Sequence, residues 1–344
     1  MTNGNIYVIN EHDATLAGVL DAHRGGVWCL ALGSIPAPVI EQVSGQAKHE
    51  DAEGPQQEER LQERDVRESS QVSDKRDVVL VSGGNDGIAK VWNKTNGECI
   101  HTLHGHTSTV KCVKMIDGCP IAVSGSRDST LKIWDIQKGV LLLTLVGHES
   151  PVRCIDVAGN LVASGSQDCR IWDIDTGECL QILKGHEFPI YAIAFDGKRV
   201  VTGSLDATVR VWSAASGDCL AVLREHTSLV NHLQLMQDTL ISGGIEGYIS
   251  VFDLNDYSCV RRINAHPKHA VTCLQSDGRV IVSGGTDGYV KLWDLQTGTL
   301  VRQLDEGCEA VWKVALRADG RVIVLCKRQG KAVLDLLMVL FPKV

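Results

Sequence analysis

Histidine, hydroxyl and carboxylate side chains, the three components of a nucleophilic triad, recur together along this chain. The sets are His106, Ser124 and Asp128; His148, Ser164 and Asp168; and His186, Thr202 and Asp206. An enzyme needs one activated nucleophile, whereas this set returns in successive segments. We therefore interpret these residues as buried polar groups that satisfy one another's hydrogen bonds, and we predict no catalytic residue and no enzymatic activity.

Charged and aromatic residues occupy two positions that can be compared from segment to segment. The first position follows the opening Val or Ile of an apolar run and holds Trp28, Lys111, Arg153, Tyr191, Asn231, Thr272 and Trp312. The second precedes a turn Asp or Glu and holds Asn85, Arg127, Gln167, Leu205, Ile245, Thr286 and, by alignment of the last segment, Arg328. In a ring of such segments both positions would lie on one rim, around the mouth of a central channel.

Lys111, Arg127 and Arg153 fall at these two positions in neighbouring segments. Cations without an equally recurrent acidic partner repel one another, and an anionic ligand relieves that repulsion. Guanidinium groups bind phosphate through paired, charge-assisted hydrogen bonds, each worth roughly 1.5–3 kcal/mol. The three cations therefore predict a phosphopeptide site, with the aromatic residues of the first position as an apolar wall. The alternative is that they are ordinary solvated surface cations.

The elements that must position these residues follow a repeat. A Trp landmark falls at Trp92, Trp134, Trp172, Trp212, Phe252 and Trp293, and a His landmark keeps the same register at His106, His148, His186, His226 and His266. A repeat of about 40 to 45 residues with Gly-His and Trp-Asp signatures is typical of one four-stranded blade of a β-propeller. Counting first strands from Val27 to Val311 predicts an all-β, seven-bladed WD-repeat β-propeller, formed as a single domain by residues 1–344.

The chain ends and one long connection depart from the repeat. We expect Thr15–Leu20 to be the fourth strand of the blade that begins at Val311, because a strand borrowed from the other terminus closes the ring without an exposed edge. Alternatively, Ile6–Leu20 belongs to an incomplete first blade of an eight-bladed propeller. Residues 35–75 are polar, mixed in charge and free of aromatic residues, which predicts a disordered insertion within blade one.

Composition disfavours several classes of protein. The formal net charge is -8, so a general nucleic-acid-binding surface is not expected. No apolar run has membrane-spanning length, and no secretory leader is apparent. Eight of the 12 cysteines recur at equivalent strand positions without zinc-ligand spacing. We interpret them as small buried hydrophobic residues of a reduced, intracellular protein, and we predict no metal and no cofactor.

Several segments carry a more specific pattern than the repeat alone. They are GECIHTLHGHTSTVKC, SGSRDSTLKIWDI, SPVRCIDV, TGSLDATVRVW, AVTCLQ and DGYVKLWDLQTG. They resemble the propeller of the F-box/WD-repeat substrate receptors of Skp-cullin-F-box ubiquitin ligases, of the cell-division-control type. In that family the rim binds a phosphothreonine-proline motif, or phosphodegron, through clustered basic residues with neighbouring aromatic residues.

The resemblance implies a site and partners for this chain. Lys111, Arg127 and Arg153 would bind the phosphate, and the surrounding pocket would include Trp28, Tyr191, Trp312 and Arg328; Lys111 stands where the family often has Arg. Family members also carry an F-box helical module that binds the Skp adaptor, whereas only 22 residues precede His23 here.

The expected function is therefore that of a non-enzymatic substrate receptor in ubiquitin-dependent degradation, located in the nucleus, the cytoplasm or both. Its expected partners are phosphorylated protein substrates, and Skp-cullin ligase subunits only where an F-box is supplied elsewhere, with neither nucleic acid nor membrane. The alternative is a general WD-repeat scaffold that binds unmodified partners in signalling or transcription.

Overall fold

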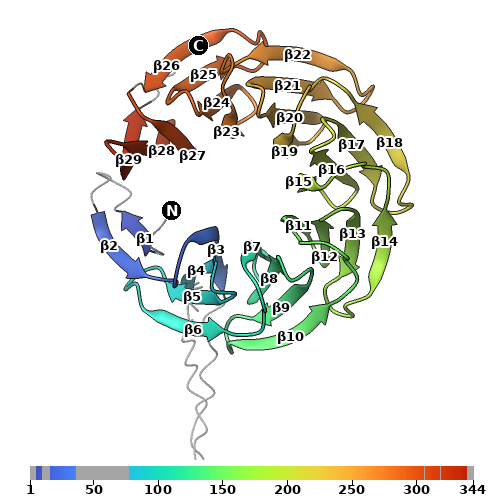
Figure 1. The fold of residues 1–344 in the computed structure, drawn as a ribbon, viewed down its shortest axis with the longest axis vertical. Coiled ribbons are helices and arrows are strands. Elements are labelled where there is room, and N and C mark those ends of the chain that lie inside the picture. The colour runs from blue at the N-terminus through green and yellow to red at the C-terminus, as the bar shows by residue number, and fades with distance from the viewer. Residues whose placement is uncertain (1–4, 10–15, 36–76, 306, 318, 339–344) are drawn as a thin grey trace, which may run out of the picture.

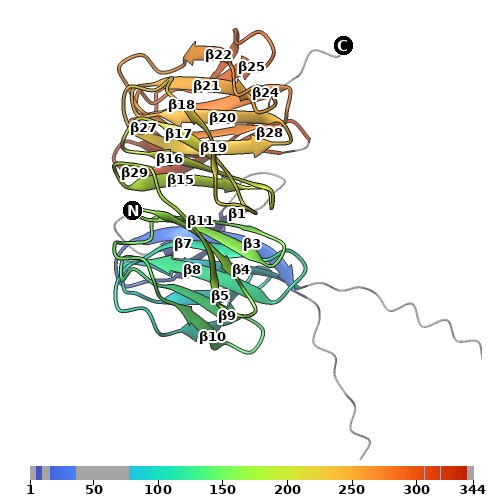
Figure 2. The same cartoon turned by 90° about the vertical axis from the view of Figure 1, so that its right-hand side faces the viewer.

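The protein is a ring of small antiparallel sheets around a central opening (Figure 1), which Figure 2 shows from its edge. The computed structural model describes residues 5–9, 16–35, 77–305, 307–317 and 319–338. All helices and strands assigned in these residues are β-strands. In that part of the chain, no helix is long and apolar enough to cross a membrane. The predicted all-β propeller architecture is confirmed.

The described strands form six sheets of four strands, one of three and one of two. In each four-stranded sheet the strands follow one another in chain order, and the first lies nearest the central opening (Figure 1). The first three of these sheets are β3 (Val27–Ile35), β4 (Asp77–Gly84), β5 (Ala89–Asn93) and β6 (Cys99–Leu103); β7 (Val110–Met115), β8 (Ile121–Ser126), β9 (Leu131–Asp135) and β10 (Val140–Leu145); and β11 (Cys154–Ala158), β12 (Leu161–Gly165), β13 (Cys169–Asp173) and β14 (Cys179–Leu183).

The ring continues through three further four-stranded sheets and one of three strands. They are β15 (Ile190–Phe195), β16 (Arg199–Ser204), β17 (Val209–Ser213) and β18 (Cys219–Leu223); β19 (Val230–Met236), β20 (Thr239–Gly244), β21 (Tyr248–Asp253) and β22 (Cys259–Asn264); β23 (Val271–Ser276), β24 (Val280–Gly285), β25 (Val290–Asp294) and β26 (Leu300–Asp305); and β27 (Ala310–Leu316), β28 (Arg321–Arg328) and β29 (Lys331–Met338).

Neighbouring sheets pack face to face through small and β-branched residues. On β17, Val209 and Val211 are fully buried and Arg210 between them is partly exposed, as the two-residue period of a strand requires. At Gly125, an added Cβ would lie 2.7 Å from both Cys112 Sγ and Val152 Cγ1. The glycine therefore allows the inner end of β8 to approach the next sheet closely.

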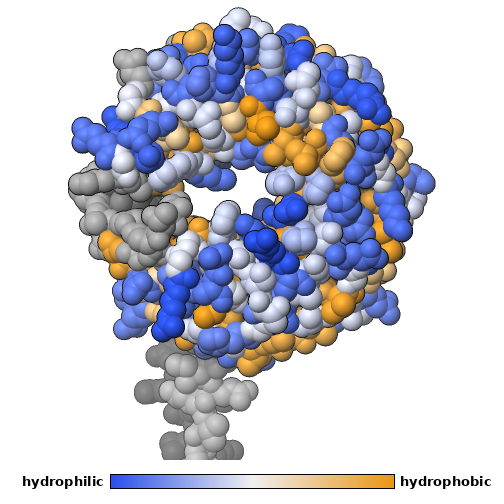
Figure 3. Space-filling view, in the orientation of Figure 1, coloured by the Kyte–Doolittle hydropathy of each residue, from blue (hydrophilic) through white to orange (hydrophobic). Residues whose placement is uncertain are grey.

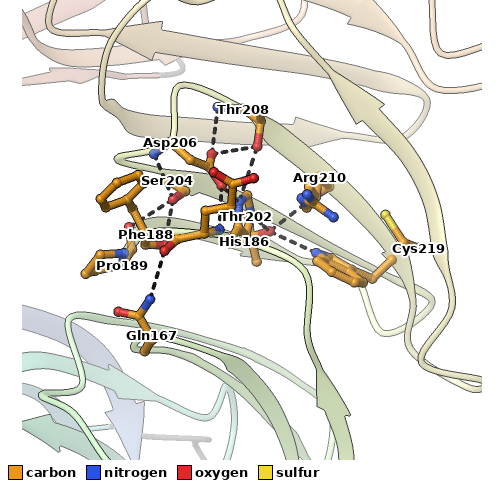
Figure 4. A network of polar contacts seen from close by, with 12 residues as sticks. Gln167, His186, Phe188, Pro189, Thr202, Ser204, Asp206, Thr208, Arg210 and Cys219 are labelled. Carbon is orange, nitrogen blue, oxygen red and sulfur yellow. Dashed lines mark hydrogen bonds and ion pairs between the residues drawn. The ribbon is translucent and has the colours of Figure 1, made fainter.

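The recurring His, hydroxyl and carboxylate residues are joined by hydrogen bonds in six sheets. In the β15–β18 sheet (Figure 4), His186 lies 2.7 Å from both Asp206 Oδ2 and Thr202 Oγ1, and the Trp212 indole donates to the same hydroxyl at 2.8 Å. The corresponding sets are His23, Ser82 and Asp86; His106, Ser124 and Asp128; His148, Ser164 and Asp168; His226, Ser242 and Glu246; and His266, Ser283 and Asp287.

These contacts are those of the structural role predicted from the sequence. Burial lowers the pKa of His186, so its ring is neutral near pH 7 and bridges the hydroxyl to the carboxylate. The His lies in the connection before each first strand, and its acidic partner lies in the turn after the second. Each network therefore fastens these two loops together and shapes the rim of the ring.

The N-terminal strands pair differently from the expectation. β2 (Leu16–Asp21) pairs with β1 (Asn5–Ile9), and among the described residues neither joins β27–β29. The predicted addition of Thr15–Leu20 to the sheet that begins at Val311 is therefore wrong. The pairing has two physical reasons. Ile6 and Leu20 are buried together against Trp92 of the next sheet, and pairing two strands that are close in sequence costs little loop-closure entropy. The two-stranded sheet has the form of the incomplete blade in the eight-bladed alternative; the number of blades stays a prediction.

The predicted insertion lies between β3 and β4. Ile35 pairs with Asp77 at the last register position of these two strands, so the intervening chain leaves and re-enters one hairpin. Residues 36–76, on which the prediction of disorder depends, lie outside the described residues.

Candidate functional site

The two positions compared in the sequence lie next to each other at the rim. The backbone N–H of Arg127 donates to the carbonyl of Thr109, the residue directly before β7, at 2.9 Å. The same bond joins Leu205 to Pro189 and Ile245 to Leu229 in later sheets. The turn after each second strand is therefore anchored beside the beginning of each first strand.

A β-bulge directs the residues of the first position. Val110 pairs with Ser126 and Cys112 with Gly125, so Lys111 is the extra residue between them. The same irregularity occurs at Trp28, Tyr191, Asn231, Thr272 and Trp312. A bulge changes the direction of a side chain and often occurs at binding sites. The sequence aligned these residues correctly but did not reveal the bulge that distinguishes them from the buried residues on either side.

Two cations of the first position stack on aromatic residues from neighbouring sheets. Lys111 Nζ lies 3.1 Å from the centre of the Trp28 ring, and the Arg153 guanidinium carbon lies 4.9 Å from the centre of the Tyr191 ring. Cation–π contacts of this kind contribute about 0.5–2 kcal/mol. Trp28 and Tyr191 therefore flank the two cations, so that a row of aromatic, cation, cation and aromatic residues follows the rim across four sheets.

The cation cluster carries uncompensated positive charge. Burial and the neighbouring charges of Arg127 and Arg153 lower the pKa of Lys111, which places all three within electrostatic reach of one another. Among the described residues, no carboxylate forms an ion pair with any of them. Arg153 Nε is buried and has no hydrogen-bond partner among the described residues. The rim at β7–β12 therefore presents a concentration of positive charge.

A cavity of about 250 Å³ extends from these cations into the channel. Its lining includes Lys111, Arg153 and Tyr191, together with Asn231 and His232 from β19. Burial lowers the pKa of His232 to about 4, so this ring adds no positive charge near pH 7. Asn231 was aligned at the first position but was not predicted as a site residue; its polar amide at that position was the available signal.

Hydrophobic side chains lie on the other side of the channel mouth from the cations. Figure 3 shows hydrophilic residues over β7 and β11 and hydrophobic ones over β15 and β19. Phe188, Leu205 and Ile245, from the loops of these latter sheets, are each at least 39% exposed. The rim thus combines a positively charged part with an apolar part.

Arg328 and Trp312 lie apart from this cluster, in the sheet of β27–β29. Arg328 Nη2 donates to both carboxylate oxygens of Asp305 at 2.6 Å, and this bond raises the pKa of Arg328. In the pairing of β27 with β28, Lys327 lies opposite Ala310. Arg127 has the same place beside Thr109 in its own sheet, so Lys327 rather than Arg328 is the structural equivalent of Arg127. Lys327 is in turn paired with Glu309 at 2.7 Å. The structure does not bring Arg328 or Trp312 into contact with the three clustered cations.

Asp305 also belongs to a possible metal-binding group that the sequence did not indicate. Its carboxylate and the sulfurs of Cys308 and Cys326 lie within 4.8 Å of one another. Burial raises the pKa of Cys308 to about 12, which opposes the thiolate form that metals require. Arg328 already balances the charge of Asp305. The contacts that this group makes are those of an ion pair that joins β26 to β28.

Comparison with known proteins identifies part of the chain. The WD domain, G-beta repeat, family matches residues 97–135, 139–173, 177–213 and 257–294. These four segments are WD40 repeats. The first repeat spans β6–β9 and includes Lys111 and Arg127, and the second spans β10–β13 and includes Arg153. The segment between the third and fourth repeats, which has Phe252 and Glu246 in place of Trp and Asp, lies outside the match.

Two individual proteins are similar to this WD40 chain. The WD repeat-containing protein pop1 of Schizosaccharomyces pombe (strain 972 / ATCC 24843) is 44% identical over 39 residues, which are 11% of this chain and 5% of pop1. The crystal structure of the computationally designed Ika8 protein resembles 98% of this chain and 91% of its own, with a TM-score of 0.78 and 28% identity. The fold is thus a β-propeller that contains four WD40 repeats.

Proposed function

We propose that this WD-repeat propeller is a receptor for phosphorylated peptides, bound at the rim by Lys111, Arg127 and Arg153. The proposal is carried by the convergence of these three cations without a carboxylate partner among the described residues. Their mutual repulsion, which contributes to the lowered pKa of Lys111, is relieved when an anion binds.

The geometry favours a phosphate group as that anion. Two guanidinium groups and one ammonium group offer N–H donors from three backbone positions, and a phosphate accepts hydrogen bonds on three oxygens. The exposed apolar residues Phe188, Leu205 and Ile245 would then contact side chains of the same peptide. A peptide that carries both a phosphate and apolar residues fits these two parts of the rim.

A wider role follows from the resemblance of the rim segments to F-box/WD-repeat receptors. In this role the chain selects phosphorylated Thr-Pro substrates for ubiquitin-dependent degradation, in the nucleus, the cytoplasm or both. Ligase subunits would join through an F-box supplied elsewhere. This part of the proposal is supported by sequence motifs such as HTSTVKC and SGSRD, and the phosphate site is supported by geometry.

Peptide binding tests the proposal. Fluorescence polarisation compares a Thr-Pro peptide in phosphorylated and unphosphorylated forms, using the wild-type chain and the variants Arg127→Ala and Arg153→Ala. We expect binding of the phosphorylated form only, and a loss of more than about 2 kcal/mol in each variant, as for the anchor residues of other interfaces. Equal binding of both forms by folded protein would instead support a scaffold for unmodified partners.

A further inference from the structure

We propose that Trp28 and Tyr191 are positioning residues that hold Lys111 and Arg153 at a fixed spacing and thereby make the rim selective for phosphate over carboxylate. This inference rests on the proposed phosphopeptide function and assigns a mechanism of specificity to the same site. It differs from the role of an apolar wall for the ligand, because the aromatic rings act on the protein's own cations.

The first support is the alternation of residue types along the rim. Residues at one structurally equivalent position occur in the order Trp28, Lys111, Arg153 and Tyr191. Lys111 Nζ lies 3.1 Å from the centre of the Trp28 ring, and the Arg153 guanidinium carbon lies 4.9 Å from the centre of the Tyr191 ring. Each ring belongs to the neighbouring sheet on the side away from the other cation. The two stacks therefore draw the cations in opposite directions along the rim.

The second support is the cost of holding two flexible cations together. Lys and Arg side chains each have about 2 kcal/mol of rotamer entropy, and two like charges in solvent would separate by rotating away from each other. Lys111 nevertheless lies partly buried beside Arg127 and Arg153. Each aromatic ring lies on the far side of its cation from the other cation, so the two stacks do not oppose the repulsion. They restrict each cation to one position, since Trp and Tyr are favourable partners for cations.

Fixed spacing discriminates between anions by their shape. A carboxylate presents two oxygens in one plane, which one guanidinium fork can satisfy. A phosphate presents three oxygens around a tetrahedral centre and gains most when separate donors are already placed around it. Removal of the Trp28 and Tyr191 rings, on which the cations stack, should therefore weaken phosphate binding more than carboxylate binding.

The experiment measures the ratio of affinities for two peptides that differ only in the anion. Fluorescence polarisation compares a phosphothreonine peptide with the same peptide carrying Glu at that position, for Tyr191→Leu, Tyr191→Phe, Trp28→Leu and Trp28→Phe. We expect each Leu variant to lower the phosphate-to-carboxylate ratio by about tenfold, consistent with loss of one cation–π contact. Each Phe variant, which keeps a ring, should retain most of the ratio.

Tyr248→Leu is a matched control. It removes another Tyr–Arg stack, in which the Arg262 guanidinium lies 4.2 Å from the ring centre, but the cation belongs to β22 and not to the rim cluster. Its affinity ratio should equal that of the wild type. Thermal unfolding of every variant tests whether the chain remains folded. Because the Trp28 side chain is 54% exposed, we expect its two variants to lose less stability than those of Tyr191.

The outcomes separate this inference from the proposed function. An unchanged ratio in both Leu variants, or an equal loss in the Leu and Phe variants, would overturn the positioning role while leaving phosphopeptide binding in place. Failure of the folded wild-type chain to prefer the phosphorylated peptide would overturn the proposed function and this inference together.

Discussion

Two parts of the rim show how similar cations serve different purposes. At β7–β12, Lys111, Arg127 and Arg153 have aromatic neighbours or solvent around them and no carboxylate partner among the described residues. At β27–β28, Arg328 is bound by Asp305 and Lys327 by Glu309. Under the proposed function, cations with an internal partner stabilise the fold, and those without a carboxylate partner bind the ligand. Partner geometry, rather than charge alone, would then separate binding residues from structural ones.

The largest expected effect separates the two parts by peptide affinity. Arg153→Ala should weaken binding of a phosphothreonine peptide by more than about 2 kcal/mol, because it removes a charge-assisted anchor. Arg328→Ala should change that affinity by less than about 0.5 kcal/mol, since screened, distant charges contribute little. Isothermal titration calorimetry of the two variants measures both values. A larger loss in Arg328→Ala would reverse the assignment.

The reverse order is expected for stability. Arg328→Ala should lower the free energy of unfolding by about 1–2 kcal/mol, because it removes the guanidinium that balances the charge of the mostly buried Asp305 carboxylate. Glu309→Gln is the matched control, since it breaks the more exposed pair with Lys327 and should cost less than about 0.5 kcal/mol. Urea unfolding compares the variants. Equal losses would mean that the Arg328 pair is an ordinary surface contact.

A smaller effect should appear in the pH dependence of binding. The pKa of Lys111 is lowered by burial, by Arg127 and by Arg153; Cys29 and Cys112 also face it, but burial raises their own pKa values, to about 12 for Cys29. As pH rises through the lowered pKa, Lys111 loses its charge, so phosphopeptide affinity should fall about three- to tenfold.

Lys111→Arg provides the comparison for this pH effect, because Arg keeps its charge over the range. Its affinity should stay level between pH 7 and 10, whereas that of the wild type declines. For the free protein the sign is opposite: a lowered pKa means that the folded state disfavours the charged lysine, so this group's contribution to stability increases as pH rises toward its unfolded pKa. A parallel decline in both proteins would exclude Lys111 as the titrating group.

The sequence predicted the parts of the structure that depend on local repetition. Landmarks such as His186 and Trp212 recur in register because the four-stranded sheets share the same type of hydrogen-bonded network. The same alignment placed Lys111, Arg127 and Arg153 at one rim. The fold prediction succeeded because the determining contacts lie within one sheet or between adjacent sheets, and the site residues stay a prediction.

Other features depend on contacts that the repeat does not encode. β2 pairs with β1 rather than with the last sheet. Which of the two partners β2 takes depends on contacts outside the repeat, so the repeat pattern could not predict it. The pairing of Arg328 with Asp305 of β26 was not predictable, because the sheet of Arg328 lacks the His and Trp landmarks. The bulges at the rim and the stacking of cations on Trp28 and Tyr191 became visible only with the register of the strands.

The most direct test of the central claim observes the arginine side chains themselves. Nitrogen-15 NMR spectra of the Nε–Hε groups, assigned by substitution, are recorded during titration with a phosphothreonine peptide. The account predicts shifts for Arg127 and Arg153 that saturate with binding, and no saturating shift for Arg328. Saturating shifts of Arg328 with unchanged Arg127 and Arg153 signals would contradict it.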